Sequence, residues 1–255
     1  MPGDHTDQAA KHHYPAVTVD VVIFTLEQGA LHLLLVQRKL PPFEGAWAIP
    51  GGFVHPDEPL DAAARRELAE ETGVHDVYLE QLYTFGDPRR DPRGRVISVA
   101  YIALVRSERQ RLAAASDAAD VRWFPVNDLP RPLAFDHDLI VRYAVDRLRS
   151  KLEYTTLAFQ LLPAVFTLPE LKSIYEQILG EALDRGNFYR KIKAAELLEE
   201  AHGFREGKGR PARLYRFRTD QREGDFVFRW REARLRDGET GHSSGKEGDD
   251  AGNDR

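Results

Sequence analysis

The chain of 255 residues contains no cysteine. This excludes disulfides, thiol catalysis and cysteine-ligated zinc, and it fits a reducing compartment, so we expect a cytoplasmic protein. No apolar run approaches the ~18–20 residues that a membrane span needs, so we expect no membrane partner. The first residues, MPGDHTDQAAKHHYP, lack the apolar stretch of a signal peptide, and we expect residues 1–14 to form a loose tail.

Charge is distributed unevenly along the chain. The formal net charge is -5, yet residues 185–236 hold 15 Lys and Arg against 8 Asp and Glu. Residues 237–255 are acidic and almost free of apolar side chains, which predicts a disordered acidic tail. A basic block between acidic segments is typical of a module that binds a polyanion, and it is also compatible with an ordinary solvated surface rich in arginine.

Hydrophobic patterning predicts strands followed by helices and a basic hairpin. A capping box at Thr167–Glu170 predicts a helix to about Leu179, and Asn187 is a suitable N-cap for another helix ending near Glu200. The other expected elements are strands at 17–25, 31–37, 77–85, 95–105 and 121–126, helices at 59–72 and 136–152, a hairpin at 203–218 and a further strand at 225–230.

In the stretch GFVHPDEPLDAAARRELAEETGV, residues 52–74, acidic residues fall on the helix face that should pack against the core. At ~100° per residue, Glu67 and Glu71 fall within about 20° of the apolar Leu60, and Glu70 lies beside the same stripe. Carboxylates on an inward face repel one another and lose hydration unless cations compensate. Oxygen ligands without His or Cys suit Mg²⁺ or Mn²⁺, so we predict a metal site.

These residues resemble the Nudix signature at each defining position. The matching residues are Gly52, Glu58, Arg66, Glu67, Leu68, Glu70, Glu71, Gly73 and Val74. The resemblance implies hydrolysis of a nucleoside diphosphate derivative, with Glu67, Glu70 and Glu71 as metal ligands and Arg66 orienting them. Glu58 is either a further catalytic acid at the metal site or a cap for the helix that begins at Pro59.

Several arginines outside the box are candidates for contacting the ligand. Arg38 ends the second strand, and LYTFGDPRRDPRGRVISVAY resembles the segment that follows the box in proteins of the ADP-ribose type. By that resemblance Arg90 and Arg93 bind phosphate or ribose, while Tyr83 or Phe85 stacks on adenine. The alternative is a solvated turn, and NADH, other nucleotide sugars or oxidised nucleotides are alternative ligands.

The basic block carries the candidates for DNA binding. Cations in the first turns of a helix oppose its dipole, so stability does not explain Arg190, Lys191 and Lys193, whereas contact with phosphate does. We therefore predict a DNA interface made of Asn187, Tyr189, Arg190, Lys191, Lys193, Lys208 and Arg210.

The stretches TLAFQLLP, FTLPELKSIYEQILG, NFYRKI and GRPARLYRF resemble the C-terminal domain of Nudix-related transcriptional regulators of bacterial NAD metabolism. The resemblance implies an α+β chain with a Nudix domain at 15–152, a mixed sheet between helices, and a winged helix-turn-helix domain at 153–236. It also implies a homodimer that binds a double-stranded operator and responds to ADP-ribose. Since the box is intact, two alternatives stay open: a Mg²⁺-dependent hydrolase whose C-terminal module does not bind DNA, and a module that is a structural cap.

Overall fold

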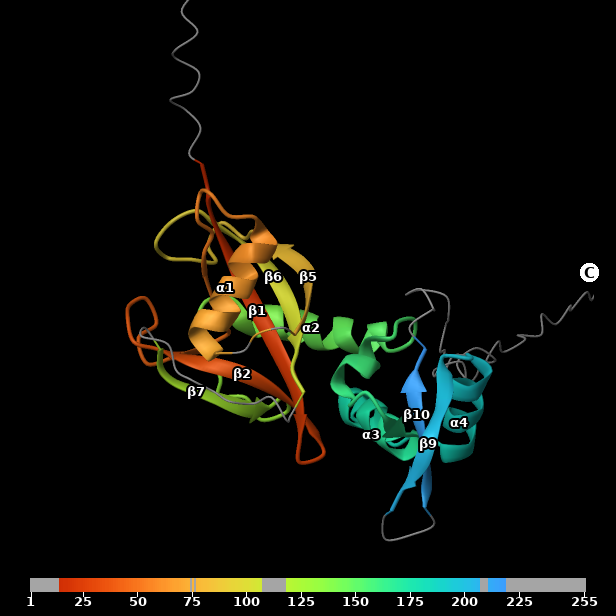
Figure 1. Ribbon diagram of the computed structural model, residues 1–255. Coiled ribbons are helices and arrows are strands. Elements are labelled where there is room, and N and C mark those ends of the chain that lie inside the picture. Colours follow the sequence, from red (N-terminus) through yellow and green to blue (C-terminus); the bar gives the residue numbers. More distant parts are fainter. Residues whose placement is uncertain (1–13, 74, 76, 107–117, 207–210, 219–255) are drawn as a thin grey trace, which may run out of the picture.

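The computed structural model describes residues 14–73, 75, 77–106, 118–206 and 211–218 (Figure 1). Both predicted tails, except for Tyr14, and the predicted strand at 225–230 lie outside the described residues, as do Val74, Lys208 and Arg210. No helix in these ranges is long and apolar enough to cross a membrane.

The first half of the described chain forms the predicted mixed sheet, which has seven strands and the path β3-β2-β1-β6-β5. β1 runs parallel to β6 and antiparallel to β2. In addition, β4 pairs with β1, and β7 pairs with β2. Runs of β-branched and aliphatic residues favour these long central strands. The bounds are β1 Ala16–Glu27, β2 Ala30–Arg38, β3 Trp47–Ala48, β4 Gly51–Phe53, β5 Tyr78–Phe85, β6 Val96–Leu104 and β7 Ala118–Pro125.

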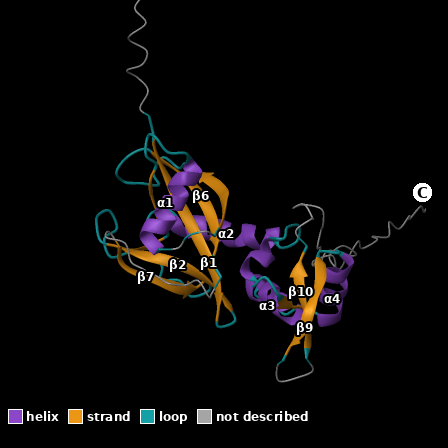
Figure 2. Ribbon diagram, viewed as in Figure 1, coloured by secondary structure: helices purple, strands orange, loops and turns teal. Residues whose placement is uncertain are grey.

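Two helices cover opposite faces of this sheet. Because side chains alternate along a strand, Val19, Val21 and Ile23 of β1 pack with α1 (Leu60–Thr72), while Val22 and Phe24 pack with the α2 side (His137–Lys151). Figure 2 shows the helices on either side of the strands. The prediction of a sheet between helices is confirmed.

The second half of the described chain is a smaller helical unit closed by a three-stranded sheet, in the order β8-β10-β9. Its α3 starts with the predicted capping box, in which Thr167 and Glu170 satisfy each other's backbone N–H groups. The elements are η3 Leu157–Leu161, β8 Phe166–Thr167, α3 Leu168–Leu179, α4 Arg185–Ala194, β9 Leu198–Arg205 and β10 Ala212–Phe217.

The start and end of α4 differ from the prediction. Its N-cap is Asp184, whose side chain accepts a hydrogen bond of 2.7 Å from the backbone N–H of Asn187, so Asn187 lies inside the first turn. The helix ends at Ala194 and not near Glu200, because Glu196 takes a positive φ of 53° and the chain then enters β9. Lys191 and Lys193 therefore lie in the last turn, where cations favour the helix dipole, so the prediction that they oppose it was wrong. The turn between α3 and α4 is therefore only residues 180–184, which suits a helix-turn-helix.

One hydrophobic core continues from the first unit into the second. Ile140, Leu148 and Leu152 belong to the same buried cluster as Leu157 of η3 and Leu171 of α3. Across the junction, the Arg149 Nε–H donates to the carbonyl of Ile178 at 3.0 Å. The two units are thus packed together rather than joined only by a linker.

Candidate functional site

Arg66, on α1, gathers the acids of the box. Its Nη1 donates to Glu67 at 2.6 Å and to Glu70 at 3.2 Å, while Nε and Nη2 bind Glu58 at 3.0 and 2.5 Å. A further bond of 3.2 Å from Nη2 to the carbonyl of Phe53 ties this arginine to the loop before the helix. One guanidinium therefore fixes three carboxylates in a single cluster.

The Arg66 guanidinium, helped by the backbone N–H of His55, lowers the pKa of Glu58 to about 2. Glu58 does not cap α1: the N-cap residue is Pro59, and no side chain caps this end. Of the two roles open for Glu58, the structure rules out the cap.

Gly52 gives the Glu67 carboxylate its place. A Cβ built on Gly52 would lie 2.3 Å from Oε1 of Glu67, a separation that real side chains do not show. The absence of a side chain at Gly52 therefore lets Glu67 lie directly against β4, where it is buried. This close approach explains why the box begins with glycine.

The described acids of the box supply carboxylate oxygens, the donor type that a hard divalent cation takes. Glu67 and Glu70 both direct an oxygen at Arg66 Nη1, so their carboxylates converge on a point that already holds positive charge. Carboxylate oxygens are the ligands that Mg²⁺ and Mn²⁺ prefer. Within the described ranges no three acidic or histidine side chains are arranged as a complete metal site.

The inward orientation predicted for the three acids is correct for only one of the two that are described. Ala63, Ala64 and Leu68 form the buried stripe of α1 and Glu67 joins them, but the Glu70 side chain is 58% exposed. Glu70 is on the exposed side of the stripe, where Arg66 reaches it from one turn earlier. The Glu71 side chain is outside the described set. Gly73 ends the helix with φ 70°, as the box predicts.

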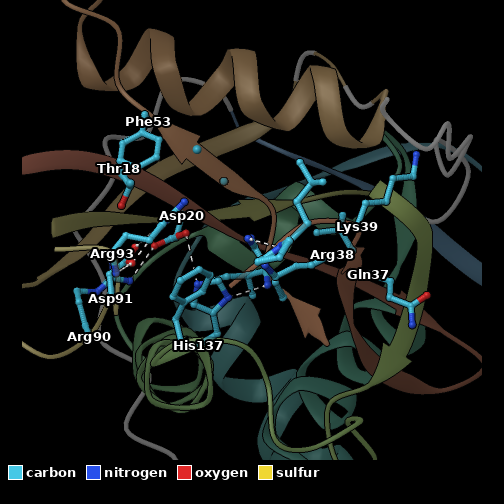
Figure 3. Close-up of a pocket in the computed structure, with 18 residues that line it drawn as sticks. Thr18, Asp20, Gln37, Arg38, Lys39, Phe53, Arg90, Asp91, Arg93 and His137 are labelled. Atoms are coloured by element: carbon cyan, nitrogen blue, oxygen red, sulfur yellow. Dashed lines mark hydrogen bonds and ion pairs between the residues drawn. The ribbon is translucent and has the colours of Figure 1, made fainter. Parts of the chain in front are cut away.

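A cavity of about 260 Å³ opens beside this acidic cluster, lined by Gly51, Gly52 and Phe53 of β4. Figure 3 shows Arg38 and Lys39 on one side of it and Arg90, Asp91 and Arg93 on another. Arg38 donates through Nε to the Pro42 carbonyl at 2.8 Å, and Arg93 donates to Asp91 at 2.7 Å. The sequence-predicted arginines thus meet at one cavity, next to the box.

Phe135 lies between two of these arginines. The Cζ atoms of Arg38 and Arg93 lie 4.9 and 5.5 Å from the centre of its ring, and Arg93 also lies 5.1 Å from the ring of Phe53. Phe135 has φ 53°, a conformation that is costly for a bulky residue and is found mainly where a site requires it. The cavity therefore combines positive charge with aromatic surface.

Arg90 is in the cavity wall but its guanidinium is already engaged. Its side chain is 3% exposed and binds Asp136 at 2.8 Å and Asp20 at 3.3 Å. The ring of His137 accepts the Ile49 N–H at Nδ1 over 3.0 Å and points Nε2 at Asp20, 3.6 Å away. Burial lowers the pKa of His137, so the ring is held neutral in this network.

Sequence reasoning missed Asp20, Phe135 and His137. A charged residue in the middle of the apolar strand VTVDVVIFT was a detectable signal for Asp20, whereas nothing local marks Phe135. The aromatic residues suggested for adenine, Tyr83 and Phe85, pack against Tyr143 at 5.0 and 5.9 Å. The aromatic rings that line the cavity are those of Phe53 and Phe135.

The second unit presents part of the predicted DNA-binding set. Arg190 and Lys193 are exposed on α4, Tyr189 and Lys191 are half-buried, and the inward face is held by the buried Phe188 and Ile192. Asn187, also half-buried, accepts a hydrogen bond from Arg190 at 2.9 Å. α4 and the hairpin of β9 and β10 lie next to each other in Figure 1.

Known protein families match both structural units of the chain. Residues 14–144 match the NUDIX domain model and residues 158–217 match the NrtR DNA-binding winged helix domain. The chain is 39% identical to the ADPR responsive transcriptional repressor NtrR of Acinetobacter baylyi, over 87% of this chain and 88% of that one.

Two further matches are an enzyme that corresponds to about half of the chain and a DNA complex that corresponds to most of it. An ADP-ribose pyrophosphatase of Methanocaldococcus jannaschii is 41% identical over 51% of this chain and 72% of its own length. The crystal structure of Shewanella oneidensis NrtR complexed with a 27mer DNA superposes with a TM-score of 0.73, at 39% identity, over 83% of this chain and 97% of that one.

Proposed function

This chain belongs to the NrtR family, a Nudix domain followed by a DNA-binding winged helix, and from that premise we propose that it is a bacterial transcriptional repressor that responds to ADP-ribose. The observation that carries the proposal is the cavity beside the Nudix box, where Arg38 and Arg93 flank Phe135 in a chain that also holds a winged helix. NAD-metabolism genes are its proposed targets.

The cavity has the chemistry that ADP-ribose requires. We assign Arg38 and Arg93 to the diphosphate, because guanidinium groups match phosphate oxygens in geometry and charge. Phe53 and Phe135 offer flat apolar surface for a ring. We assign Arg90 a supporting role in this site: bound to Asp20 and Asp136, it shapes the wall and adds positive charge behind the arginines that face the ligand.

We further propose that the domain hydrolyses ADP-ribose. Glu67, Glu70 and Glu71 would hold Mg²⁺ or Mn²⁺, which neutralises phosphate charge and lowers the pKa of water when bound. Glu58 fixes the Nε and Nη2 groups of Arg66, and Nη1 of Arg66 sets the direction of the Glu67 and Glu70 carboxylates. Gly52 keeps Glu67 at the cavity edge. The relative that is an ADP-ribose pyrophosphatase supports the same substrate.

We propose that residues 153–236 bind an operator in the cytoplasm, and that the chain acts as a homodimer on a palindromic site, with residues 15–152 as the ligand-binding domain. In a helix-turn-helix the second helix enters the major groove, which assigns that role to α4 with Asn187, Tyr189, Arg190, Lys191 and Lys193. Lys208 and Arg210, which lie between β9 and β10 in the sequence, are assigned to the DNA backbone.

The test combines two measurements on one protein. AMP release from ADP-ribose with Mg²⁺ is followed for the wild type and for the double variant Glu70→Gln and Glu71→Gln, beside gel shifts of genomic fragments with and without ADP-ribose. We expect the variant to lose turnover and to keep DNA binding, and ADP-ribose to change the shift of the wild type. A wild type that binds no fragment at low salt would refute the repressor, and turnover equal to that of the variant would refute the hydrolase.

A further inference from the structure

The arginines described on the hairpin are paired with glutamates of the same unit. On β10, Arg216 Nε binds Glu199 Oε1 at 3.2 Å and Arg213 binds Glu200, and on β9 Arg205 binds Glu170. Arg205 also donates to the Val165 carbonyl at 3.1 Å, and Glu170 belongs to the capping box of α3, so this third pair anchors the base of the hairpin. In the described part of the chain, neither of the two pairs between β9 and β10 has a side-chain bond to a backbone carbonyl or to a helix cap.

The pair Glu200–Arg213 lies toward α4. The hydrogen bond from Arg213, and then the positive charge of Lys193 exposed on that helix, lower the pKa of the Glu200 carboxyl, so Glu200 has cations of both β10 and α4 in its surroundings. Arg213 in turn lies over the ring of Phe204, 5.8 Å from its centre, and that ring is 59% exposed. Lys193, Glu200, Arg213 and Phe204 thus form an array that runs from α4 to the hairpin, here called the α4–hairpin array.

Because Glu200 pairs with a cation on this exposed surface, it takes the position in which another anion would contact Arg213. Glu200 and Arg213 are both solvent-exposed, with side chains 60% and 49% accessible. Exposed pairs of this kind are weak, so a competing anion can replace the carboxylate at small cost. A DNA phosphate offers the same charge-assisted contact to the arginine. The adjacent phosphates of the duplex add a negative potential that a single carboxylate lacks.

We propose that Glu200 is an internal stand-in for a DNA phosphate: it holds Arg213 in the free protein, and the duplex backbone displaces it on binding. This rests on the proposed DNA binding and adds a residue that tunes its strength. The exchange lowers the affinity for DNA of any sequence, because the Arg213–Glu200 ion pair must break before Arg213 contacts a phosphate. The displaced Glu200 also takes up a solution cation, which reduces the net ion release on binding.

The neighbouring residue supplies a matched control. Glu199 carries the same charge and pairs with Arg216, but successive residues of a strand point to opposite faces, so it lies away from Glu200 and the α4–hairpin array. Glu199→Gln and Glu200→Gln therefore change the net charge equally and differ in which face loses it. Arg213→Gln removes the cation through which Glu200 is proposed to act.

The experiment measures binding of the full chain to a mixed-sequence duplex of 27 base pairs, the length bound by the Shewanella relative, by fluorescence anisotropy over a salt series. We expect Glu200→Gln to bind about two- to five-fold tighter, with a salt slope steeper by up to about one ion, since an exposed pair is worth that much. Glu199→Gln should stay near the wild type. Arg213→Gln should bind more weakly, and adding Glu200→Gln to it should recover little.

Each other outcome contradicts the proposal. Equal gains from Glu199→Gln and Glu200→Gln would mean that net charge alone matters. The same gain from Glu200→Gln with and without Arg213 would mean that the carboxylate repels DNA directly. If the wild type fails to bind any duplex at low salt, the proposed repressor fails first. Wild-type binding with an unchanged Glu200→Gln overturns only the stand-in.

Discussion

At the scale of single residues, Gly52 determines where the Glu67 carboxylate lies. A methyl group there would overlap Glu67 Oε1, and that atom is the far end of a flexible side chain, so the chain folds while the carboxylate moves. We predict that Gly52→Ala lowers AMP release at least about ten-fold, which corresponds to ~1.4 kcal/mol in the barrier, with little loss of thermal stability. Gly86→Ala is the matched control, because its Cβ would meet only ordinary contacts at 3.8 Å or more. Equal activity of both variants would contradict this role of Gly52.

The buried His137 predicts a pH dependence of stability. Burial lowers its pKa in the folded state against the usual 6.5, while Asp20 and Asp136 oppose this shift and Arg90 and Arg38 add to it. Below pH 6.5 the unfolded chain therefore binds a proton that the folded chain resists, so stability falls as pH decreases from 7 to 5. The slope from this residue is at most about 1.4 kcal/mol per pH unit.

Urea unfolding at several pH values, with His137→Gln and the exposed His202→Gln side by side, measures this contribution. The first variant should show a shallower decline between pH 7 and 5, and the second should follow the wild type. A decline identical in all three proteins would assign the pH dependence to other groups.

At the scale of elements, α4 begins at a different N-cap residue from the one that the sequence predicted. Asp184 accepts the Asn187 N–H, so we predict that Asp184→Ala costs about 1 kcal/mol of unfolding free energy, the usual worth of an N-cap. Asn187→Ala should cost less, because its side chain bonds only Arg190 at the exposed surface. Chemical denaturation of both variants checks this order, and the reverse order would support the cap expected from the sequence.

The whole molecule unfolds, by our prediction, as one cooperative unit. The same buried cluster includes Leu148 of α2 and Leu171 of α3, so neither half keeps its core when the other opens. ADP-ribose at one hundred times its Kd should raise the unfolding free energy of this unit by about 2.7 kcal/mol. Calorimetry should then show a single transition that moves as a whole. Two transitions, of which ADP-ribose moves only one, would contradict the shared core.

The sequence was most informative where chemistry and periodicity coincide. The box residues, the long strands and the capping box of α3 follow from local patterns, because spacing and hydrogen-bond partners lie within a few residues of each other. Phe135 could not be found this way, since its role depends on Arg38 and Arg93 reaching it from distant parts of the chain. For the same reason, the sequence pattern did not predict the pairing of Arg213 with Glu200, because it showed only that residues 185–236 are rich in basic side chains.

The continuous core between the halves has a consequence for protein engineering. Grafting this winged helix onto another ligand-binding domain by joining the chains near residue 153 would leave η3 and α3 facing a foreign surface. A working chimera would have to carry over the residues of α2 and β2 that contact them, with Leu152, Leu157 and the Arg149 bond to Ile178 included. The unit of exchange in this protein is therefore an interface together with a domain, and sequence boundaries alone are a poor guide to where a fusion should be cut.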